Sequence, residues 1–302
     1  MTYIGKLVTF ALVDSVRVDD LSKLAALPEV AMVEWQEPLY QADDVSSRAA
    51  QGRTSVTYSP NTAEDKGFTG SGVNVAIIDS GLDDTHEAFT GKFVAGFDAR
   101  NTTDPGDGST HPPDLTTHGT HVAGIALGRE TTGRICRTAA DGSPSNCGGM
   151  APGAGVVAVG VCDSGGCSGI YKGLDWLAAH AAQFNVRAAN ISIGGCNNDD
   201  GTSAVSQQVN YLVAVGVAVA VAAPNCGTPG SQLIGPVSAA SFAITTAGTD
   251  DRGTVNRSDD TIWAGYSVGP RTDFNLVSPN LQALKPDIAA PAATSCQLWL
   301  AV

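Results

Sequence analysis

The chain has 302 residues, of which 43% are hydrophobic and 16% are charged, and its formal net charge is −13. This length and composition predict one large domain with a sizeable core and a small appendage. The acidic balance argues against nucleic acid and anionic membranes as partners. No apolar run reaches the roughly 18 residues that a membrane-spanning helix needs. Charged residues follow closely after Leu12, so any secretion signal is expected upstream of this chain.

The first 45 residues differ from the rest and predict a small α+β unit. Val8–Val18 alternates like a strand, Asp20–Leu27 has the pattern of a short helix, and Val30–Glu37 predicts a second strand. The polar stretch Gln41–Thr62 is predicted to be a linker.

From Val73 onward, apolar strands alternate with helices. The predicted strands are Val73–Ile78, Gly155–Val161, Ala188–Ile193, Val217–Ala223 and Phe242–Ala247, and the predicted helices include Ile170–Gln183 and Ser203–Val215. The strand 217–223 is apolar at every position, which is typical of a strand covered on both faces. The predicted fold class is therefore α/β, with a mostly parallel central sheet and helices on both faces.

Two pairs of cysteines bracket short polar loops, Cys136 with Cys147 and Cys162 with Cys167. Short closures of this kind indicate disulfides formed in an oxidising compartment, which favours an extracellular enzyme. A zinc site is the alternative interpretation, but neither a C-x₂-C motif nor a nearby His supports it.

Three polar side chains stand where such a sheet places its active site. Asp79 ends an apolar strand, His118 opens a helix rich in small residues, and Asn225 follows the buried strand 217–223. Open α/β sheets place their sites at the carboxyl ends of the strands. An Asp that orients a His, a His that acts as base and then acid, and an Asn that donates to an oxyanion are parts of an acyl-transfer site.

Five segments together resemble the signatures of the subtilisin-like serine proteases (subtilases, peptidase family S8). They are Ile77–Gly81, His118–Gly124, Asn190–Gly195, Ala222–Gly227 and Lys285–Pro291, in the order of the family. The resemblance covers about residues 46–291. It implies a secreted serine endopeptidase that needs no catalytic cofactor, with Asp79 and His118 in an Asp-His-Ser triad and Asn225 as the oxyanion donor.

The resemblance also implies a substrate site in which Ser192, Ile193 and Gly194 pair with an extended peptide as an added β-strand. The further residues assigned to this substrate site are Gly195, Ala222 and Ala223. Cys196 and Cys226 follow the two segments that flank the specificity pocket in the family, so they are expected to form a third disulfide. Cys296 is then left unpaired.

Residues 1–45 resemble the C-terminal part of the family's inhibitory propeptide, and residues 46–302 resemble its catalytic domain. The expected partners are a peptide or protein substrate and the chain's own propeptide as an intramolecular inhibitor. We expect a monomer outside the cell, bound to neither nucleic acid nor membrane. Structural calcium stays open, because carboxylates lie near His118 at Asp104, Asp107 and Asp114. A solvated acidic loop is the alternative, and Ala88 stands where some relatives carry a ligating Asp.

Two features depart from the family. Pro224 stands where the family has Gly, and because proline fixes φ and lacks an N–H, a displaced Asn225 is predicted. After Pro291 the chain lacks the family's Gly-Thr-Ser-Met-Ala segment, and Ser295 comes too early and opens no helix. The tail is compatible with a frameshift, so this chain is expected to be inactive and poorly stable. The alternative is a natural non-catalytic relative that binds peptides.

Isolated motifs suggest three alternatives: an aspartic protease, a hydrolase with a nucleophile elbow, and a metal site. A second Asp-Ser-Gly, at Asp163, suggests an aspartic protease, but it lies in a Cys-flanked turn. Ser267 has the spacing of a nucleophile elbow within Gly265–Gly269, but no His follows it. His118 and His121 are spaced like metal ligands, but no Glu lies between them, so no metal site is predicted there.

Overall fold

The computed structural model describes residues 43–129, 148–226, 233–263, 265 and 267–292, and a few positions before them (3–4, 11–12, 20, 23 and 26–28). The chain divides into two compact units, Met1–Leu39 and Tyr40–Val302. In the first unit, β1 (Tyr3–Ile4) pairs antiparallel with β2 (Ala11–Leu12), which lies inside the first predicted strand. The predicted strand 30–37 and most of the predicted helix 20–27 lie outside the described residues.

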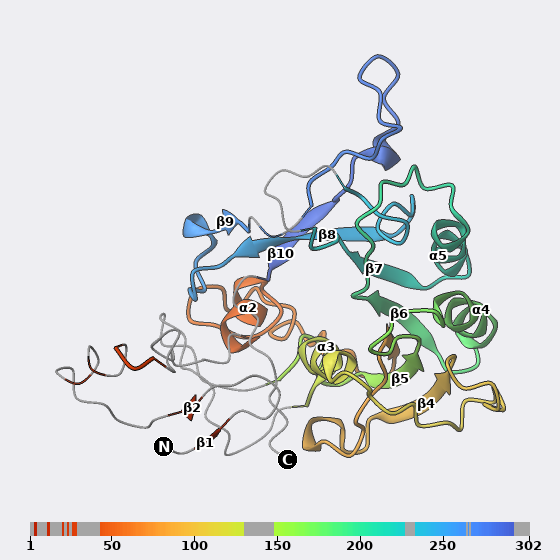
Figure 1. Ribbon diagram of the computed structural model, residues 1–302, viewed down its shortest axis with the longest axis horizontal. Helices are drawn as coiled ribbons and strands as arrows, with labels where there is room; N and C mark the ends of the chain where they lie inside the picture. Colours follow the sequence, from red (N-terminus) through yellow and green to blue (C-terminus); the bar gives the residue numbers. More distant parts are fainter. Residues whose placement is uncertain are drawn as a thin grey trace. The chain divides into compact units, whose positions relative to one another are not determined.

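The second unit is built on an eight-stranded sheet (Figure 1). Its strands are β3 (Asn74–Asp79), β4 (Phe93–Asp98), β5 (Gly155–Gly160), β6 (Val186–Ile191), β7 (Ala218–Ala222), β8 (Ile244–Asp250), β9 (Thr261–Ile262) and β10 (Ile288–Pro291). The order is β10-β8-β7-β6-β3-β5-β4 with all neighbours parallel, and β9 pairs antiparallel with β8. The prediction of a mostly parallel sheet is confirmed, and all five predicted strands are present with small shifts at their ends.

Helices cover both faces of this sheet, as predicted. α3 (His118–Leu127) lies on one face, and α4 (Ile170–His180) and α5 (Ala204–Ala214) lie on the other (Figure 1). Alternate residues of β3 enter two separate cores: Ile77 packs with Leu127 of α3, whereas Ile78 belongs to the core with Leu177 of α4 and Leu212 of α5. Each buried side chain of this size contributes about 1.5–3 kcal/mol relative to exposure.

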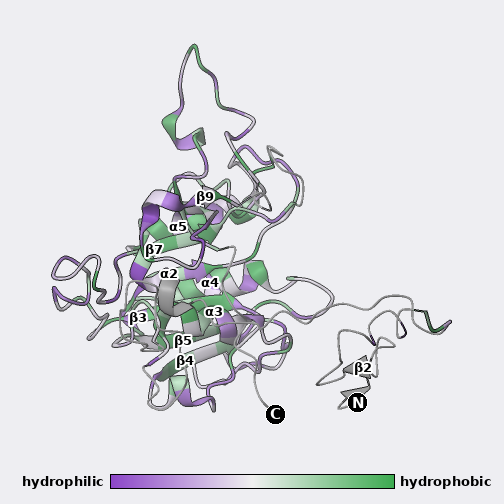
Figure 2. Ribbon diagram, turned by 90° about the vertical axis from the view of Figure 1, so that its left-hand side faces the viewer, coloured by the Kyte–Doolittle hydropathy of each residue, from purple (hydrophilic) through white to green (hydrophobic). Residues whose placement is uncertain are grey.

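Figure 2 shows this distribution along the ribbon: hydrophobic residues gather in the central strands and the helices beside them, and the loops mix hydrophilic, intermediate and hydrophobic residues. Within the described ranges, short 3₁₀ helices lie in the connections at Glu87–Phe89, Arg257–Asp259 and Leu281–Ala283. Among the helices that the structure describes, none has the length and apolar character needed to cross a membrane.

The predicted linker at residues 41–62 is wrong for the part that the structure describes. It contains α2 (Asp43–Ala49), and Arg48 and Arg53 are buried. Ser46 Oγ donates to the fully buried Asp251 at 2.7 Å, and the Arg53 guanidinium lies 3.3 Å from Glu64. Polar composition suggested solvent exposure, but here the polar groups find partners inside the fold.

Candidate active site

A pocket of about 360 Å³ opens at the carboxyl ends of β3, β6 and β7. Most of the residues predicted to be functional line it: Asp79, His118, Ser192, Ile193, Gly194, Ala222, Ala223 and Asn225. Gly195 is absent from the lining, and its carbonyl packs closely against Gly235. The topology brings these segments together because parallel strands end at the same edge of the sheet.

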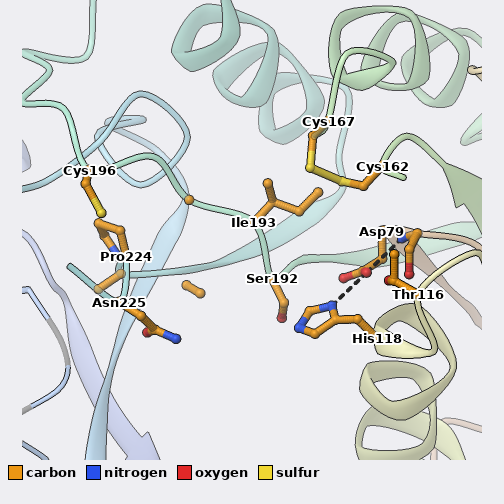
Figure 3. A pocket seen from close by; sticks show the side chains of 14 residues that line it. Asp79, Thr116, His118, Cys162, Cys167, Ser192, Ile193, Cys196, Pro224 and Asn225 are labelled. Carbon is orange, nitrogen blue, oxygen red and sulfur yellow. Dashed lines mark hydrogen bonds and ion pairs between the residues drawn. A yellow bond between two sulfur atoms is a disulfide. The ribbon is translucent and has the colours of Figure 1, made fainter. Parts of the chain in front are cut away.

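Asp79 and His118 form a hydrogen-bonded pair on one side of the pocket (Figure 3). Asp79 is the last residue of β3 and is 2% exposed, and His118 is the first residue of α3. His118 Nδ1 lies 2.8 Å from Asp79 Oδ1, which also accepts the Ser80 N–H at 2.7 Å. Since Nδ1 faces the carboxylate, Nε2 is left facing the pocket (Figure 3).

The charge state of His118 is governed mainly by Asp79. The hydrogen bond to Asp79 raises the pKa of His118 above its ordinary value, and the negative charges of Asp79 and Asp114 act in the same direction. Burial opposes this rise but does not cancel it. A His held in this way is a stronger base than a free imidazole, and its cation is stabilised once it has taken a proton.

Asp114 organises the entrance of α3, a role that the sequence did not reveal. It accepts hydrogen bonds from Ser80 Oγ at 2.7 Å and from the Thr120 N–H at 2.7 Å. Ser80 Oγ in turn accepts the Gly119 N–H at 2.9 Å. Burial raises the pKa of Asp114, but the hydrogen bonds from Thr120 and Ser80 outweigh it, so the pKa lies below its ordinary value.

The acidic loop before His118 uses its carboxylates locally. Asp104 accepts the N–H groups of Asp98 and Gly106, each at 2.7 Å, and Asp107 accepts the Ser109 N–H at 2.9 Å. In the part of the chain that the structure describes, no group of three or more His, Cys, Asp or Glu residues is arranged to hold a metal ion.

The opposite side of the pocket is formed by the segments that follow β6 and β7. Asn190 Nδ2 donates to Ser192 Oγ at 2.9 Å. A disulfide between Cys196 and Cys226, with a Cα–Cα distance of 5.5 Å, joins the two segments, so the expected bridge is confirmed.

Asn225 lines the pocket directly after Pro224, and its predicted displacement from the family's position stays a prediction. Asn225 is exposed and lines the pocket, and its amide extends from this wall toward the His118 side (Figure 3). The Pro224 carbonyl accepts the Ser267 N–H at 2.9 Å, which anchors the turn in spite of the missing proline donor.

The disulfide Cys162–Cys167 is also confirmed, and both cysteines line the pocket, a position that the sequence pattern did not indicate. The N–H groups of Val161 and Cys162 donate to the Asp79 carbonyl at 2.7 and 3.2 Å. The predicted pair Cys136–Cys147, and also Ser295 and Cys296, lie outside the described residues.

The structure does not support the two alternative interpretations, an aspartic protease with Asp163 and a nucleophile elbow with Ser267. Asp163 lies outside the pocket lining, and its carboxylate accepts the Gly165 N–H at 2.7 Å within the turn. Ser267 is fully buried, whereas a nucleophile elbow must present its hydroxyl to substrate.

Thr117, the residue before His118, has an unusual backbone conformation. It occupies the N-cap position of α3 without a side-chain capping hydrogen bond, and its φ of 68° lies in the left-handed region that β-branched residues rarely adopt. Strained backbone of this kind gathers at functional sites, where the surrounding contacts hold it in place.

Comparison with known proteins identifies the family. A sequence model of the subtilase family (peptidase S8) matches residues 70–301. Subtilisin NAT of Bacillus subtilis subsp. natto is 32% identical over 228 residues, covering 74% of this chain and 49% of the relative. Thermitase of Thermoactinomyces vulgaris is 33% identical over 158 residues, covering 52% and 49% of the two chains. This chain therefore spans about half the length of these curated relatives.

Solved structures show the same fold. Sphericase is 26% identical, with a TM-score of 0.57 over 74% of this chain and 67% of its own. The S41 psychrophilic protease superimposes with a TM-score of 0.59 over the same shares, at 24% identity. With the family match over most of the second unit, these findings show that the chain belongs to the subtilase family.

Proposed function

We propose that this protein is a secreted serine endopeptidase of the subtilisin type, which hydrolyses peptide bonds through an Asp-His-Ser triad. Asp79 and His118 are two members of the triad. The observation that carries the proposal is the 2.8 Å hydrogen bond from His118 Nδ1 to buried Asp79, with Nε2 facing the pocket. Membership in the subtilase family supports it.

In the proposed reaction, Asp79 holds the imidazole so that Nε2 is the free base. Nε2 takes the proton of a serine hydroxyl as its oxygen attacks the peptide carbonyl, and it then gives that proton to the departing amine. Water repeats the sequence to release the acyl group. Asn225, across the pocket, donates its amide hydrogen to the oxygen that becomes negative during each attack.

The wall that follows β6 is proposed to hold the substrate. Ser192, Ile193 and Gly194 continue from an extended strand into the pocket, so their backbone groups can pair with an extended peptide. Gly195, Ala222 and Ala223 complete the proposed substrate site; Ala222 and Ala223 line the pocket, and Gly195 follows Gly194 in the chain.

The regulatory and cellular parts of the proposal rest on the family resemblance. Residues 1–45 are the C-terminal part of an inhibitory propeptide that acts in the same chain, and the enzyme is a monomer outside the cell. The two disulfides support an oxidising compartment. Catalysis uses no cofactor.

The 302 residues alone are proposed to be inactive, because no segment of the printed sequence matches the family's serine motif after Pro291. Loss of such a serine lowers activity by about a million-fold. The test compares hydrolysis of a chromogenic peptide by this chain and by a chimera. In the chimera, a subtilase segment that carries Gly-Thr-Ser-Met-Ala replaces the residues after Pro291.

We expect hydrolysis by the chimera and its loss in the same chimera with His118→Ala. A folded chimera without activity would contradict the peptidase proposal. Hydrolysis by the 302-residue chain that His118→Ala abolishes would instead show that the chain carries its own nucleophile. Peptide binding without hydrolysis in both proteins would favour a non-catalytic peptide-binding relative, for which the pocket beside β6 is the supporting feature.

A further inference from the structure

Arg100 is a largely buried cation that contacts the backbone of Ser80 and Cys162, two residues that line the pocket. Its side chain is 9% exposed, and it forms a two-point ion pair with Asp98, at 2.7 Å from Nε to Oδ1 and 3.0 Å from Nη2 to Oδ2. Because the pair is close and bidentate, the guanidinium charge is compensated inside the protein.

The other three N–H groups of Arg100 donate to carbonyls from three separate segments. Nη1 binds the carbonyls of Ser80 at 2.6 Å and Cys162 at 2.7 Å, and Nη2 binds that of Pro113 at 3.0 Å. A guanidinium has five N–H donors, and here all five are used. Lysine has three donors without the planar fork, so it cannot reproduce this set of contacts.

Two of these carbonyls belong to residues next to or hydrogen-bonded to Asp79, and the third belongs to the residue before Asp114. Ser80 follows Asp79, Cys162 opens the disulfide loop and donates its own N–H to the Asp79 carbonyl, and Pro113 precedes Asp114. Arg100 itself is absent from the pocket lining. The fold makes room for it at Gly160, where a Cβ atom would come within 2.7 Å of Nη2.

We propose that Arg100 is a positioning residue, which ties together the three segments that hold Asp79 in place and thereby keeps Asp79 hydrogen-bonded to His118. This role rests on the proposed peptidase function for its consequence in catalysis, but the contact it controls can be measured without catalysis. Arg100 does not line the pocket; it acts through the backbone carbonyls of Ser80, Cys162 and Pro113.

The direction in which the pKa of His118 changes when Arg100 is replaced separates a positioning role from a direct electrostatic effect. The charged groups that act on His118 are Asp79 and Asp114, and both raise its pKa. Removing the positive charge of Arg100, with Asp98 left in place, would by itself raise the pKa of His118 further. Loss of the Asp79 hydrogen bond would instead lower the pKa, because that bond is the largest cause of the rise.

The chain offers a matched control in Arg271. Its side chain is 3% exposed, it pairs with Asp273 two residues away at 2.9 and 2.7 Å, and it donates to the Ala239 carbonyl at 2.6 Å. Neither Arg271 nor these partners line the pocket. Arg271→Met therefore removes an equivalent buried cation without disturbing the segments around Asp79.

The experiment follows the His118 ring by NMR from low to high pH in the intact 302-residue chain and in Arg100→Met, Arg100→Lys and Arg271→Met. We expect the midpoint of the His118 titration to be lower in both Arg100 variants than in the wild type, and to be unchanged in Arg271→Met. In the serine-supplied chimera, Arg100→Met should lower kcat about a hundredfold, the loss typical of a catalytic group displaced by about 1 Å.

An unchanged or raised midpoint in the Arg100 variants, or an equal fall in Arg271→Met, would overturn the proposal. If Arg100→Met does not fold, the test rests on Arg100→Lys, because lysine keeps the positive charge but lacks the planar set of five N–H donors. If the wild-type chimera hydrolyses no peptide while the midpoint still falls, the peptidase proposal fails and the positioning role of Arg100 stands.

Discussion

Ser80 donates its hydroxyl to Asp114 at 2.7 Å and, through the same oxygen, accepts the N–H of Gly119. The residue after Asp79 and the residue after His118 are thus joined by one hydroxyl. Asp114 fixes the direction of that hydroxyl, because a carboxylate can only accept. The Asp79–His118 geometry therefore depends on a carboxylate four residues before His118.

Asp114→Asn should destabilise the protein by about 1–3 kcal/mol, because an amide nitrogen cannot accept from Thr120 or Ser80. The pKa of Asp114 is lowered in the folded protein, so its contribution to stability is present above 3.8, the ordinary value, and is lost as pH falls through the folded pKa. Urea unfolding at several pH values measures this. The difference in free energy of unfolding between wild type and Asp114→Asn should become smaller on acidification below pH 3.8.

Asp107→Asn is the control for that experiment, since Asp107 is an exposed carboxylate of the same loop that accepts the N–H of the neighbouring Ser109. It should change the unfolding curve little at any pH. Equal losses at Asp107 and Asp114 would contradict the special role of Asp114.

Thr117→Gly should stabilise the protein by up to about 1 kcal/mol. Relief of a left-handed β-branched residue contributes about 1–2 kcal/mol, and the greater freedom of glycine in the unfolded chain offsets part of it. The neighbouring substitution Thr116→Gly is the comparison, because Thr116 is not among the residues with positive φ. Thermal unfolding should rank Thr117→Gly above wild type and Thr116→Gly below it; the reverse ranking would show that Thr117 is unstrained.

The two disulfides should differ in their contribution to stability. Cys196–Cys226 closes a separation of 30 residues and Cys162–Cys167 one of 5. Chain entropy then predicts losses of roughly 3–4 kcal/mol for Cys196→Ser with Cys226→Ser, and about 2 kcal/mol for Cys162→Ser with Cys167→Ser. Guanidinium unfolding of the two double variants tests this order. A larger loss from the shorter loop would mean that native contacts around Asp79, and not loop length, dominate.

Asn225→Ala should lower kcat of the serine-supplied chimera by about 100- to 1,000-fold with little change in KM, as expected for a donor that acts on the transition state. Asn197→Ala, which removes the same amide outside the pocket lining, is the comparison. A loss confined to KM in Asn225→Ala would assign Asn225 to substrate binding.

Local patterns in the sequence predicted much of the fold. Asp79 and His118 were found because a buried strand and a small-residue helix point directly to them, and Cys162–Cys167 because its loop is short. β4 was missed because Gly96 interrupts its apolar run, where Pro112 approaches closely. β10 was missed because it is short and ends in Pro291, which suits its place at the edge of the sheet.

Contacts between distant segments account for what the sequence could not show. Asp98 and Arg100 are two residues apart, but the carbonyls that Arg100 binds come from Ser80, Pro113 and Cys162. A sequence pattern cannot predict these contacts, because Arg100 binds backbone carbonyls, which every residue type has. For the same reason, the sequence shows Asp114 only as one of several acidic loop residues, because its hydrogen-bond partners become apparent only when β3 and α3 pack together.

The most direct test of this account is the titration of His118 by NMR in the wild-type chain and in Asp79→Asn. We expect a midpoint above 6.5, the ordinary value, in the wild type, and a fall toward that value when Asp79 loses its charge. Because the folded pKa is raised, the pair stabilises the protein fully below the unfolded value, and this stabilisation is lost as pH rises through the folded pKa. A wild-type midpoint at or below 6.5, or one that Asp79→Asn leaves unchanged, would contradict the claim that Asp79 holds His118 as the base of the site.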